Sequence, residues 1–371
     1  MSKSVLAARR GLVVKAGLFG AAWLLGAARA ATGAGANASN AFRAPSDTAA
    51  AIGATAAHGP FLAIAQAGKR LVAAGLRGRI AYSDDEGKTW QQARVPVEVD
   101  LVALSFPTAS EGWAVGHRGV VLTTQDAGAT WKRRFAEQQL NELIVNHYKA
   151  AGAAADSAGA RAAAGAARSI EDGSTPSLLD VWFESPTTGY VVGTFNLIFR
   201  TDDAGKTWVP TMEAVDNPEE LHFYAVRGQG NGLYMTGEKG SVWHFDAAQK
   251  RWAAVPTGYV GTLFGLVADG LRVLAYGMRG RIYASEDAGQ HWQVVSSPAK
   301  AGIVAGVRLQ GGEIVLADQS GELLQSKDAG RSFAALNAKS RVAAFSLLQS
   351  GTGQLFAAGP GGVARVAMNA S

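Results

Sequence analysis

The chain of 371 residues contains no cysteine. This absence excludes disulfide bonds, thiolate metal sites, a cysteine nucleophile and a lipid anchor attached to cysteine. Histidine is also scarce. Only six histidines are present, and no two of them have the spacing of metal ligands. We therefore expect neither a metal site nor a cofactor. Stability must come from a packed core, which a chain of this length can bury.

The first thirty residues lack acidic side chains. They combine a basic start, an apolar run at residues 16–28 and the small-x-small triplet Ala28-Arg29-Ala30. This pattern predicts a secretory signal peptide at residues 1–30 and a secreted, periplasmic protein. The pair Arg9-Arg10 leaves open whether export follows the general or the twin-arginine route.

The charge balance changes once this segment is set aside. It holds five of the 35 basic residues and none of the 30 acidic ones, which leaves 30 of each. A neutral mature chain gives no reason to expect binding to nucleic acid or general attraction to acidic lipid. Residues 31–41 are Ala, Gly, Thr, Ser and Asn, the composition of a flexible linker.

One short motif organises the remaining sequence. Ser83–Trp90 reads SDDEGKTW, a Ser/Thr-x-Asp-x-Gly-x-x-Trp/Phe pattern known as an Asp box, and it recurs at residues 124–131, 201–208, 285–292 and 326–333. The carboxylate can accept hydrogen bonds from the backbone of a tight turn, and Gly supplies a positive φ. We therefore interpret the five acids as structural: Asp85, Asp126, Asp203, Asp287 and Asp328.

The spacing of these motifs predicts the fold. Their closing aromatic residues, with Trp252 between the third and fourth, are separated by 41, 77, 44, 40 and 41 residues. A second series with the same period begins a turn in every unit, at Gly75, Gly116, Gly193, Gly237, Gly277, Asp318 and Gly359. A period near forty with four strands per unit predicts an all-β, seven-bladed β-propeller of four-stranded antiparallel blades over residues 42–371.

The seventh unit ends before a fourth strand. A ring of blades leaves an exposed edge unless another segment completes the last sheet. A strand-length segment at residues 42–57 precedes the first unit. We therefore predict that it supplies the missing strand of blade seven.

The interval of 77 residues marks an insertion at 133–177, between units two and three. Its first half places Leu140, Ile144, Tyr148 and Ala151 at helical spacing, which predicts a short amphipathic helix. Its second half, rich in Ala and Gly, is expected to form a mobile loop. Two roles remain open, since the helix could cover the propeller's own surface or bind a partner.

Sialidases share Asp boxes and are the rival class, which would make the chain a glycan-processing hydrolase. The tetrapeptide Phe42-Arg43-Ala44-Pro45 matches their Phe-Arg-x-Pro motif. Such an enzyme also needs three converging arginines and a Tyr activated by Glu. The predicted inner strands are almost wholly apolar, with Asp180, His222 and Tyr224 as their only ionisable residues. We expect no catalytic residues.

Basic residues recur at the turn between the second and third strands of several units. In a four-stranded meander, the turn from the second to the third strand shares a face with the connection to the next blade. Among the turn positions, Glu238 is the only acid, and the basic residues are Arg77, Arg79, Arg118, Lys239, Arg279 and Arg281. Such a face favours an acidic or carboxylate-bearing partner, although turn residues can also be basic for solubility alone.

Two stretches, GWAVGHRGVVLTTQDAGATW and GYVVGTFNLIFRTDDAGKTW, carry a resemblance to a known family. The chain resembles the photosystem II stability/assembly factor family over residues 61–366. The resemblance implies a non-enzymatic propeller that binds membrane-protein subunits during assembly through a basic patch. We also expect the protein to be a monomer. The chain departs from the family pattern in the degenerate Asp box at 245–252, in Asn196 and in the insertion.

Overall fold

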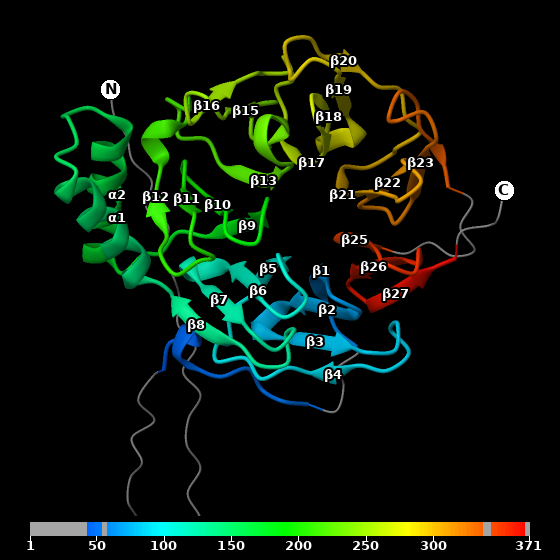
Figure 1. Cartoon of the computed structure of the whole chain (residues 1–371), viewed down its shortest axis with the longest axis horizontal. Coiled ribbons are helices and arrows are strands. Elements are labelled where there is room, and N and C mark those ends of the chain that lie inside the picture. The colour runs from blue at the N-terminus through cyan, green and yellow to red at the C-terminus, as the bar shows by residue number, and fades with distance from the viewer. Residues whose placement is uncertain (1–42, 54–57, 337–342, 368–371) are drawn as a thin grey trace, which may run out of the picture. The chain divides into compact units, whose positions relative to one another are not determined.

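Seven antiparallel sheets form a ring around a central axis (Figure 1). This architecture is seen in a computed structural model that describes residues 43–53, 58–336 and 343–367. Within each sheet, the strands follow one another in sequence order as a meander. The predicted seven-bladed propeller is therefore confirmed.

The insertion lies between blades two and three in the sequence. Blade one contains β1 (Phe61–Ala67), β2 (Arg70–Gly75), β3 (Ile80–Ser83) and β4 (Gln91–Gln92). Blade two contains β5 (Leu101–Ser105), β6 (Gly112–Gly116), β7 (Val121–Thr124) and β8 (Lys132–Phe135). Blade three contains β9 (Leu178–Phe183), β10 (Gly189–Gly193), β11 (Ile198–Thr201) and β12 (Val209–Pro210).

The remaining four blades complete the ring. Blade four contains β13 (Phe223–Arg227), β14 (Tyr234–Gly237), β15 (Val242–Asp246) and β16 (Arg251–Ala254). Blade five contains β17 (Leu263–Asp269), β18 (Arg272–Gly277), β19 (Ile282–Ser285) and β20 (Gln293–Val294). Blade six contains β21 (Ile303–Arg308), β22 (Ile314–Asp318), β23 (Leu323–Ser326) and β24 (Ala334–Ala335). Blade seven contains β25 (Ser346–Gln349), β26 (Leu355–Gly359) and β27 (Gly362–Val366).

The core lies between neighbouring blades. The second strand of a blade is covered on both faces, so β6, β10 and β22 are buried along their whole length. The first strand alternates, and in β5 every second residue is buried. Apolar residues on both faces of short strands explain this arrangement, because each sheet packs against two others.

The glycine that begins each turn between the second and third strands permits a close backbone approach. A Cβ at Gly116 would lie 2.0 Å from the carbonyl oxygen of Asp100, and one at Gly277 would lie 2.2 Å from that of Thr262. The periodic glycine is therefore required by packing against the start of the inner strand rather than by a positive φ.

Each Asp box forms a closed set of hydrogen bonds. The carboxylate of Asp85 accepts from the backbone N–H of Thr89 at 2.8 Å and from the hydroxyls of Ser83 and Thr89. The Ser83 hydroxyl in turn accepts from the N–H of Gly87 at 2.8 Å. The other four boxes repeat this pattern at Asp126, Asp203, Asp287 and Asp328.

The prediction that the N-terminal segment completes blade seven is wrong for the residues the structure describes. Residues 43–53 form no strand and contain one short 3₁₀ turn, Pro45–Asp47. The sheet of blade seven has three strands, and β27 pairs only with β26 among the described residues. The ring closes instead by side-chain packing, since β25 and β26 contact β1.

The N-terminal segment instead packs against blades one and two. The N–H of Ala50 donates to the carbonyl of Val95 at 3.0 Å, and Arg133 forms an ion pair with Asp47 at 2.6 Å. Figure 1 shows this dark-blue segment running past β4 and β8. Burial of an apolar residue and pairing of a β8 arginine thus hold the segment on blades one and two rather than at the outer edge of blade seven.

The insertion forms two helices rather than one. The predicted helix is α1 (Gln138–Ala150), and Leu140, Ile144 and Tyr148 are buried on it. The Ala-rich half, expected to be a mobile loop, is α2 (Ala158–Asp172), which begins at a Ser157 side-chain cap. Alanine has the highest helix propensity, and α2 packs along α1, so composition and tertiary contact favour the helix. No helix in the described ranges is both long and apolar enough to cross a membrane.

Candidate functional site

The turns between second and third strands lie beside the links that join consecutive blades. The N–H of His117 donates to the carbonyl of Asp100, and that of Met278 donates to Thr262, each at the start of an inner strand. The insertion emerges here as well, because the N–H of Glu137 donates to Arg118. We call this surface of turns and links the link face.

Four blades place a basic side chain at the same point of this turn. The residue before the final glycine has a positive φ of 51–57° in each, and these residues are Arg77, Arg118, Lys239 and Arg279. In blade three the equivalent position holds Phe195, with a φ of 55°, followed by Asn196 at 61°. Asn196 thus adopts the left-handed backbone that glycine adopts at this point in the other blades, and the four basic side chains are geometrically equivalent.

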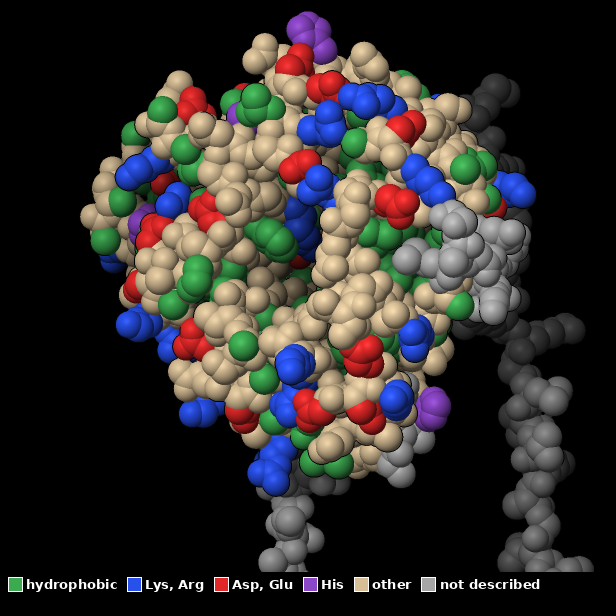
Figure 2. Space-filling view, turned by 45° about the vertical axis from the view of Figure 1, so that its right-hand side comes forward, with side chains coloured by type: hydrophobic (Ala, Val, Ile, Leu, Met, Phe, Trp, Pro, Cys, Tyr) green, Lys and Arg blue, Asp and Glu red, His purple; other side chains and the backbone are tan. Residues whose placement is uncertain are grey.

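Acidic residues of the links neutralise most of these basic side chains. Arg77 forms an ion pair with Glu98 at 2.5 Å, Arg118 pairs with Glu137 at 2.5 Å, and Lys239 pairs with Glu219. Figure 2 shows basic and acidic side chains interspersed over the surface that it presents. The link face is therefore not the uniformly positive surface that counting turn residues alone predicts.

Glu137 is the most constrained of these acids. It has a φ of 50° and accepts hydrogen bonds from Arg118 and from the hydroxyl of Ser46 in the N-terminal segment. Burial opposes its ionisation, but these two donors outweigh burial, so the pKa of Glu137 lies below its usual value.

Blade five keeps its basic side chains available. Arg279 and Arg281 are exposed and form no ion pair with any residue in the described ranges. Arg79, by comparison, donates to the carbonyl oxygen of His58 at 2.7 Å. Of the six basic residues predicted from the sequence, the structure thus leaves two without a hydrogen-bonded or acidic partner, and both belong to blade five.

Exposed apolar side chains gather on the same face. Nine large apolar side chains are exposed among the described residues, and five of them are in its turns and links: Leu76, Phe195, Val260, Met278 and Phe345. Val260 is 89% exposed and Phe195 is 66% exposed. Apolar side chains next to arginines are typical of protein-binding surfaces.

The inner strands present a ring of apolar side chains at the axis. In blades one, two, four, five and six, the strand pairing skips the second residue of the inner strand, and in blade three it skips Leu179. The skipped residues, with Phe345 in blade seven, line the central cavity; they are Leu62, Val102, Leu179, Tyr224, Phe264, Val304 and Phe345. We call these seven residues the axial rim.

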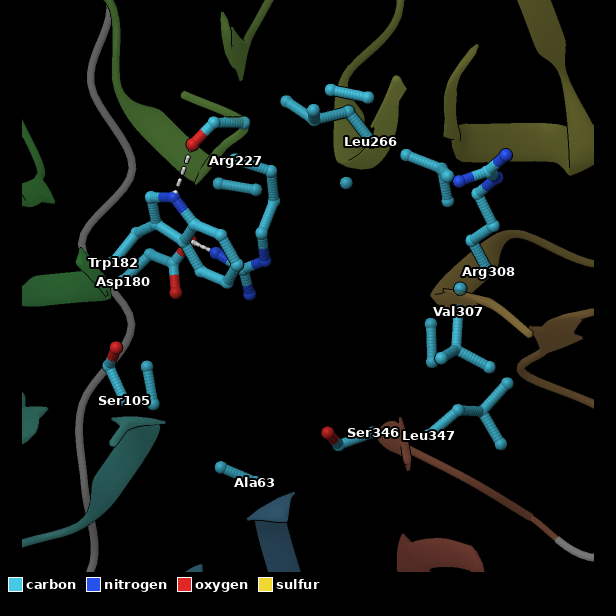
Figure 3. Close-up of a pocket in the computed structure, with 18 of the residues that line it drawn as sticks. Ala63, Ser105, Asp180, Trp182, Arg227, Leu266, Val307, Arg308, Ser346 and Leu347 are labelled. Atoms are coloured by element: carbon cyan, nitrogen blue, oxygen red, sulfur yellow. Dashed lines mark hydrogen bonds and ion pairs between the residues drawn. The ribbon is translucent and has the colours of Figure 1, made fainter. Parts of the chain in front are cut away.

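Below the axial rim lies a cavity of about 1100 Å³ along the axis. The prediction that no arginine reaches the inner strands is wrong, because β13 ends at Arg227 and β21 ends at Arg308. Figure 3 shows Arg227 beside Asp180 and Trp182 on one wall and Arg308 across the cavity. The predicted strands stopped one residue short of each arginine.

Both cavity arginines are paired. Arg227 contacts the buried carboxylate of Asp180, and its guanidinium lies 5.2 Å from the ring of Trp182. Burial raises the pKa of Asp180, against the opposing effect of Arg227 and of the N–H of Val226. Arg308 pairs with Asp269 at 3.0 Å. Each arginine therefore has an internal counter-ion.

The geometry does not match a sialidase-type centre. The described cavity lining contains two arginines, not three, and no glutamate. Burial, reinforced by Glu238, raises the pKa of Tyr224, which makes it a poor nucleophile near neutral pH. Within the described ranges there is also no group of three or more His, Asp or Glu side chains placed to hold a metal ion.

Sequence reasoning missed the acids of the links and the axial rim. Glu98, Glu137 and Glu219 lie 19–21 residues from their basic partners, so only the propeller geometry brings them together. The rim did have a sequence signal. Each turn glycine approaches the carbonyl oxygen of a link residue, and the rim residue lies two positions after that link residue. Gly116, for example, approaches Asp100, and Val102 belongs to the rim.

Comparison with known proteins identifies the same architecture. The family model described as "Photosynthesis system II assembly factor YCF48" matches residues 82–152 and 162–316, more than half of the chain. The chain is 27% identical over 135 residues to the photosystem II assembly lipoprotein Ycf48 of Synechococcus, covering 35% of this chain and 40% of that protein. It is 38% identical over 63 residues to the chloroplastic photosystem II stability/assembly factor HCF136 of Cyanidioschyzon merolae, covering 16% of this chain and 14% of that protein. These alignments therefore span less than half of the curated relatives.

Solved structures resemble the propeller over most of its length. A structure of YCF48 bound to a D1 peptide has a TM-score of 0.61 at 17% identity, covering 85% of this chain and 95% of that one. YCF48 from Cyanidioschyzon merolae gives 0.59 at 15% identity, covering 83% and 95%. The WD40 propeller of Doa1 gives 0.58 at 8%, covering 87% and 96%, so these similarities concern the fold.

Proposed function

The chain belongs to the photosystem II assembly factor YCF48 family, and on that premise we propose that it is a non-enzymatic scaffold that binds a membrane-protein subunit. The partner carries an acidic or carboxylate-bearing segment and is held on the link face during assembly or stabilisation of its complex. The observation that carries this proposal is the combination of exposed apolar side chains on that face with two arginines, Arg279 and Arg281, that pair with no acid of the described residues.

The names of the relatives support this function. Those relatives are assembly proteins of photosystem II, and a solved family structure holds a D1 peptide. A signal peptide at residues 1–30 would place this chain in the periplasm, where it acts as a monomer on segments exposed at the membrane surface. The paired arginines of the axial cavity support a binding role over a hydrolytic one.

Affinity purification from native membranes tests the proposal. The wild-type protein is compared with R279N/R281Q, since asparagine tolerates the left-handed backbone at position 279. A matched control, R251Q/K327Q, removes two exposed basic residues from β16 and from an Asp box. We expect wild type and control to recover the same membrane protein and the R279N/R281Q variant to lose it.

Salt provides a second readout. Exposed ion pairs are screened beyond a Debye length of roughly 8 Å at physiological ionic strength, so recovery by the wild type should fall as salt rises. Recovery that is equal for all three proteins at low salt would rule out the link face as the binding surface.

A further inference from the structure

The axial rim is built by the same device around the ring. In six blades the pairing of the inner strand skips one residue near its start, and that residue lines the cavity. A skipped residue is a bulge, and a bulge redirects a side chain out of the regular ladder. All of the redirected side chains are apolar or aromatic, although this position faces a water-accessible opening.

The rim opens on the link face. Each rim residue lies two positions after a link residue, and that link residue accepts a hydrogen bond from the neighbouring turn. In blade five, the N–H of Met278 donates to the carbonyl of Thr262, two residues before Phe264. The rim residues of six blades are half-buried, and Phe345 is 42% exposed. An uncovered ring of this kind gains free energy when apolar surface enters it.

Blade five connects the rim with the available arginines. Phe264 lies on the rim beside Tyr224, with ring centroids 5.8 Å apart. Met278, which is 43% exposed, stands in the turn directly before Arg279. An extended chain advances about 3.3 Å per residue, so a few residues of a partner can run from the axis along this blade.

We propose that the axial rim receives one apolar or aromatic side chain of an extended partner segment, whose carboxylate pairs with Arg279 or Arg281. This inference rests on the proposed function and adds the side-chain chemistry that the partner must offer. The rim supplies no charged group, so it selects by apolar burial, whereas the two arginines fix the direction of the segment.

A small apolar ligand and a second copy of the chain fit the surface less well. A small molecule held by the rim alone cannot reach the exposed arginines of the turn, and the seven rim side chains offer only one hydroxyl, that of Tyr224, to orient it. On every copy of the chain, basic side chains of the link face already pair with acids of the same face. Two copies that face each other therefore gain no charge complementarity.

The experiment uses phage-displayed random heptapeptides selected on the wild-type protein. We expect selected peptides to contain an aromatic or aliphatic residue followed by Asp, Glu or a free carboxyl terminus. One selected peptide is then titrated against V102T/V304T, which keeps side-chain shape and adds hydroxyls to the rim. The matched control is V209T/V294T, which makes the same change on the exposed outer strands β12 and β20.

Rim and arginine contributions are separated by the same titrations. V102T/V304T and R279N/R281Q should each weaken binding about tenfold or more, and V209T/V294T should leave it unchanged. Unfolding midpoints show that each variant is folded, and F345Q, at an exposed rim position, gives a second test. If R279N/R281Q weakens binding while V102T/V304T and F345Q do not, the rim inference fails and the proposed function stands. If no variant changes binding, both fail, and self-association that depends on the rim would assign it to a second copy.

Discussion

Arg118 of blade two donates from Nε to Glu137 at 2.5 Å, so an acid of the chain itself occupies one basic side chain of the link face. The same carboxylate accepts a 2.6 Å hydrogen bond from Ser46, which ties the N-terminal segment to the pair. A partner carboxylate that approaches Arg118 must compete with Glu137 for the guanidinium. On the proposed function, internal acids of this kind leave the arginines of blade five as the preferred contact for a partner carboxylate.

The first prediction concerns this occupied arginine. Replacing Glu137 by Gln removes the charge that neutralises Arg118, so an acidic peptide should bind the variant severalfold more tightly than the wild type at low salt. Titration of one labelled acidic peptide measures the change. The control is E142Q on the exposed surface of α1, where no ion pair is formed within the described ranges. Unchanged affinity in E137Q would show that Arg118 does not face the partner.

The second prediction concerns the buried ion pair of the axial cavity. Arg227→Met should destabilise the fold by about 3 kcal/mol, because it leaves the fully buried carboxylate of Asp180 without its counter-ion. The double variant D180N/R227M should lose less, since no charge is then left unpaired. Urea unfolding of the two variants gives both values. A double variant that loses more than R227M would mean that Asp180 has a stabilising role independent of Arg227.

The third prediction concerns acid. Hydrogen bonds from Thr89 and Ser83 lower the pKa of Asp85 to about 2, and the backbone and hydroxyl of Thr207 do the same for Asp203. Asp287 and Asp328 are lowered to about 2 in their own boxes. A carboxyl group with a depressed folded-state pKa stabilises the fold above its unfolded pKa, near 4, and loses that contribution as pH falls through 2.

Urea midpoints should therefore fall steeply between pH 4 and pH 2. D203N removes one of these titrations, so its stability deficit relative to the wild type should shrink as the pH is lowered through this window. Equal deficits at pH 5 and pH 2 would contradict the prediction, because they would show that ionisation of Asp203 does not stabilise its turn.

The sequence carries the local part of this structure and not the long-range part. The Asp box and the turn glycine recur with the same period. The contacts that each of them makes involve residues a few positions away or one carbonyl of a neighbouring link. The number and order of the blades can therefore be predicted from the sequence. The ion pair of Lys239 with Glu219 has no such signal, because twenty residues separate its members. Counting charges at the turns alone therefore overstated the positive character of the link face.

Strand ends explain a second group of errors. Arg227 and Arg308 stand at the last residue of β13 and β21, where hydrophobic alternation has already stopped. Their inward position is set by pairing with the second strand, as Arg227 pairs with Tyr234. The helix α2 was missed for a different reason, because its composition, rich in Ala and Gly, was interpreted as a mobile loop and its packing partner is another helix of the insertion.

The fourth prediction concerns the N-terminal segment. A chain that begins at His58 loses the Ala50 contact with Val95 and the Asp47 partner of Arg133, so its melting temperature should fall. Hydrogen exchange locates the effect. Backbone amides of β8 should exchange faster in the shortened chain, whereas those of β27 should be unaffected, because the described segment lies on blades one and two. Faster exchange confined to β27 would instead support closure of blade seven by residues upstream of His58.

The last prediction concerns how the insertion is held. The hydroxyl of Tyr148 accepts from the backbone N–H of Met212 at 3.0 Å and donates to Glu213 at 2.5 Å, and it joins α1 to the segment after β12. Burial raises the pKa of Tyr148, and Glu213 raises it further, so the hydroxyl keeps its proton throughout the neutral range. Tyr148→Phe leaves the Met212 N–H buried without an acceptor and should lower the free energy of unfolding, measured in urea, by about 1–3 kcal/mol.

The control is N146A, a substitution at an exposed position of the same helix. If the helix pair serves only to cover blade three, Y148F should lower stability and leave partner recovery per folded molecule unchanged; a loss of recovery at unchanged stability would make the insertion part of the binding surface.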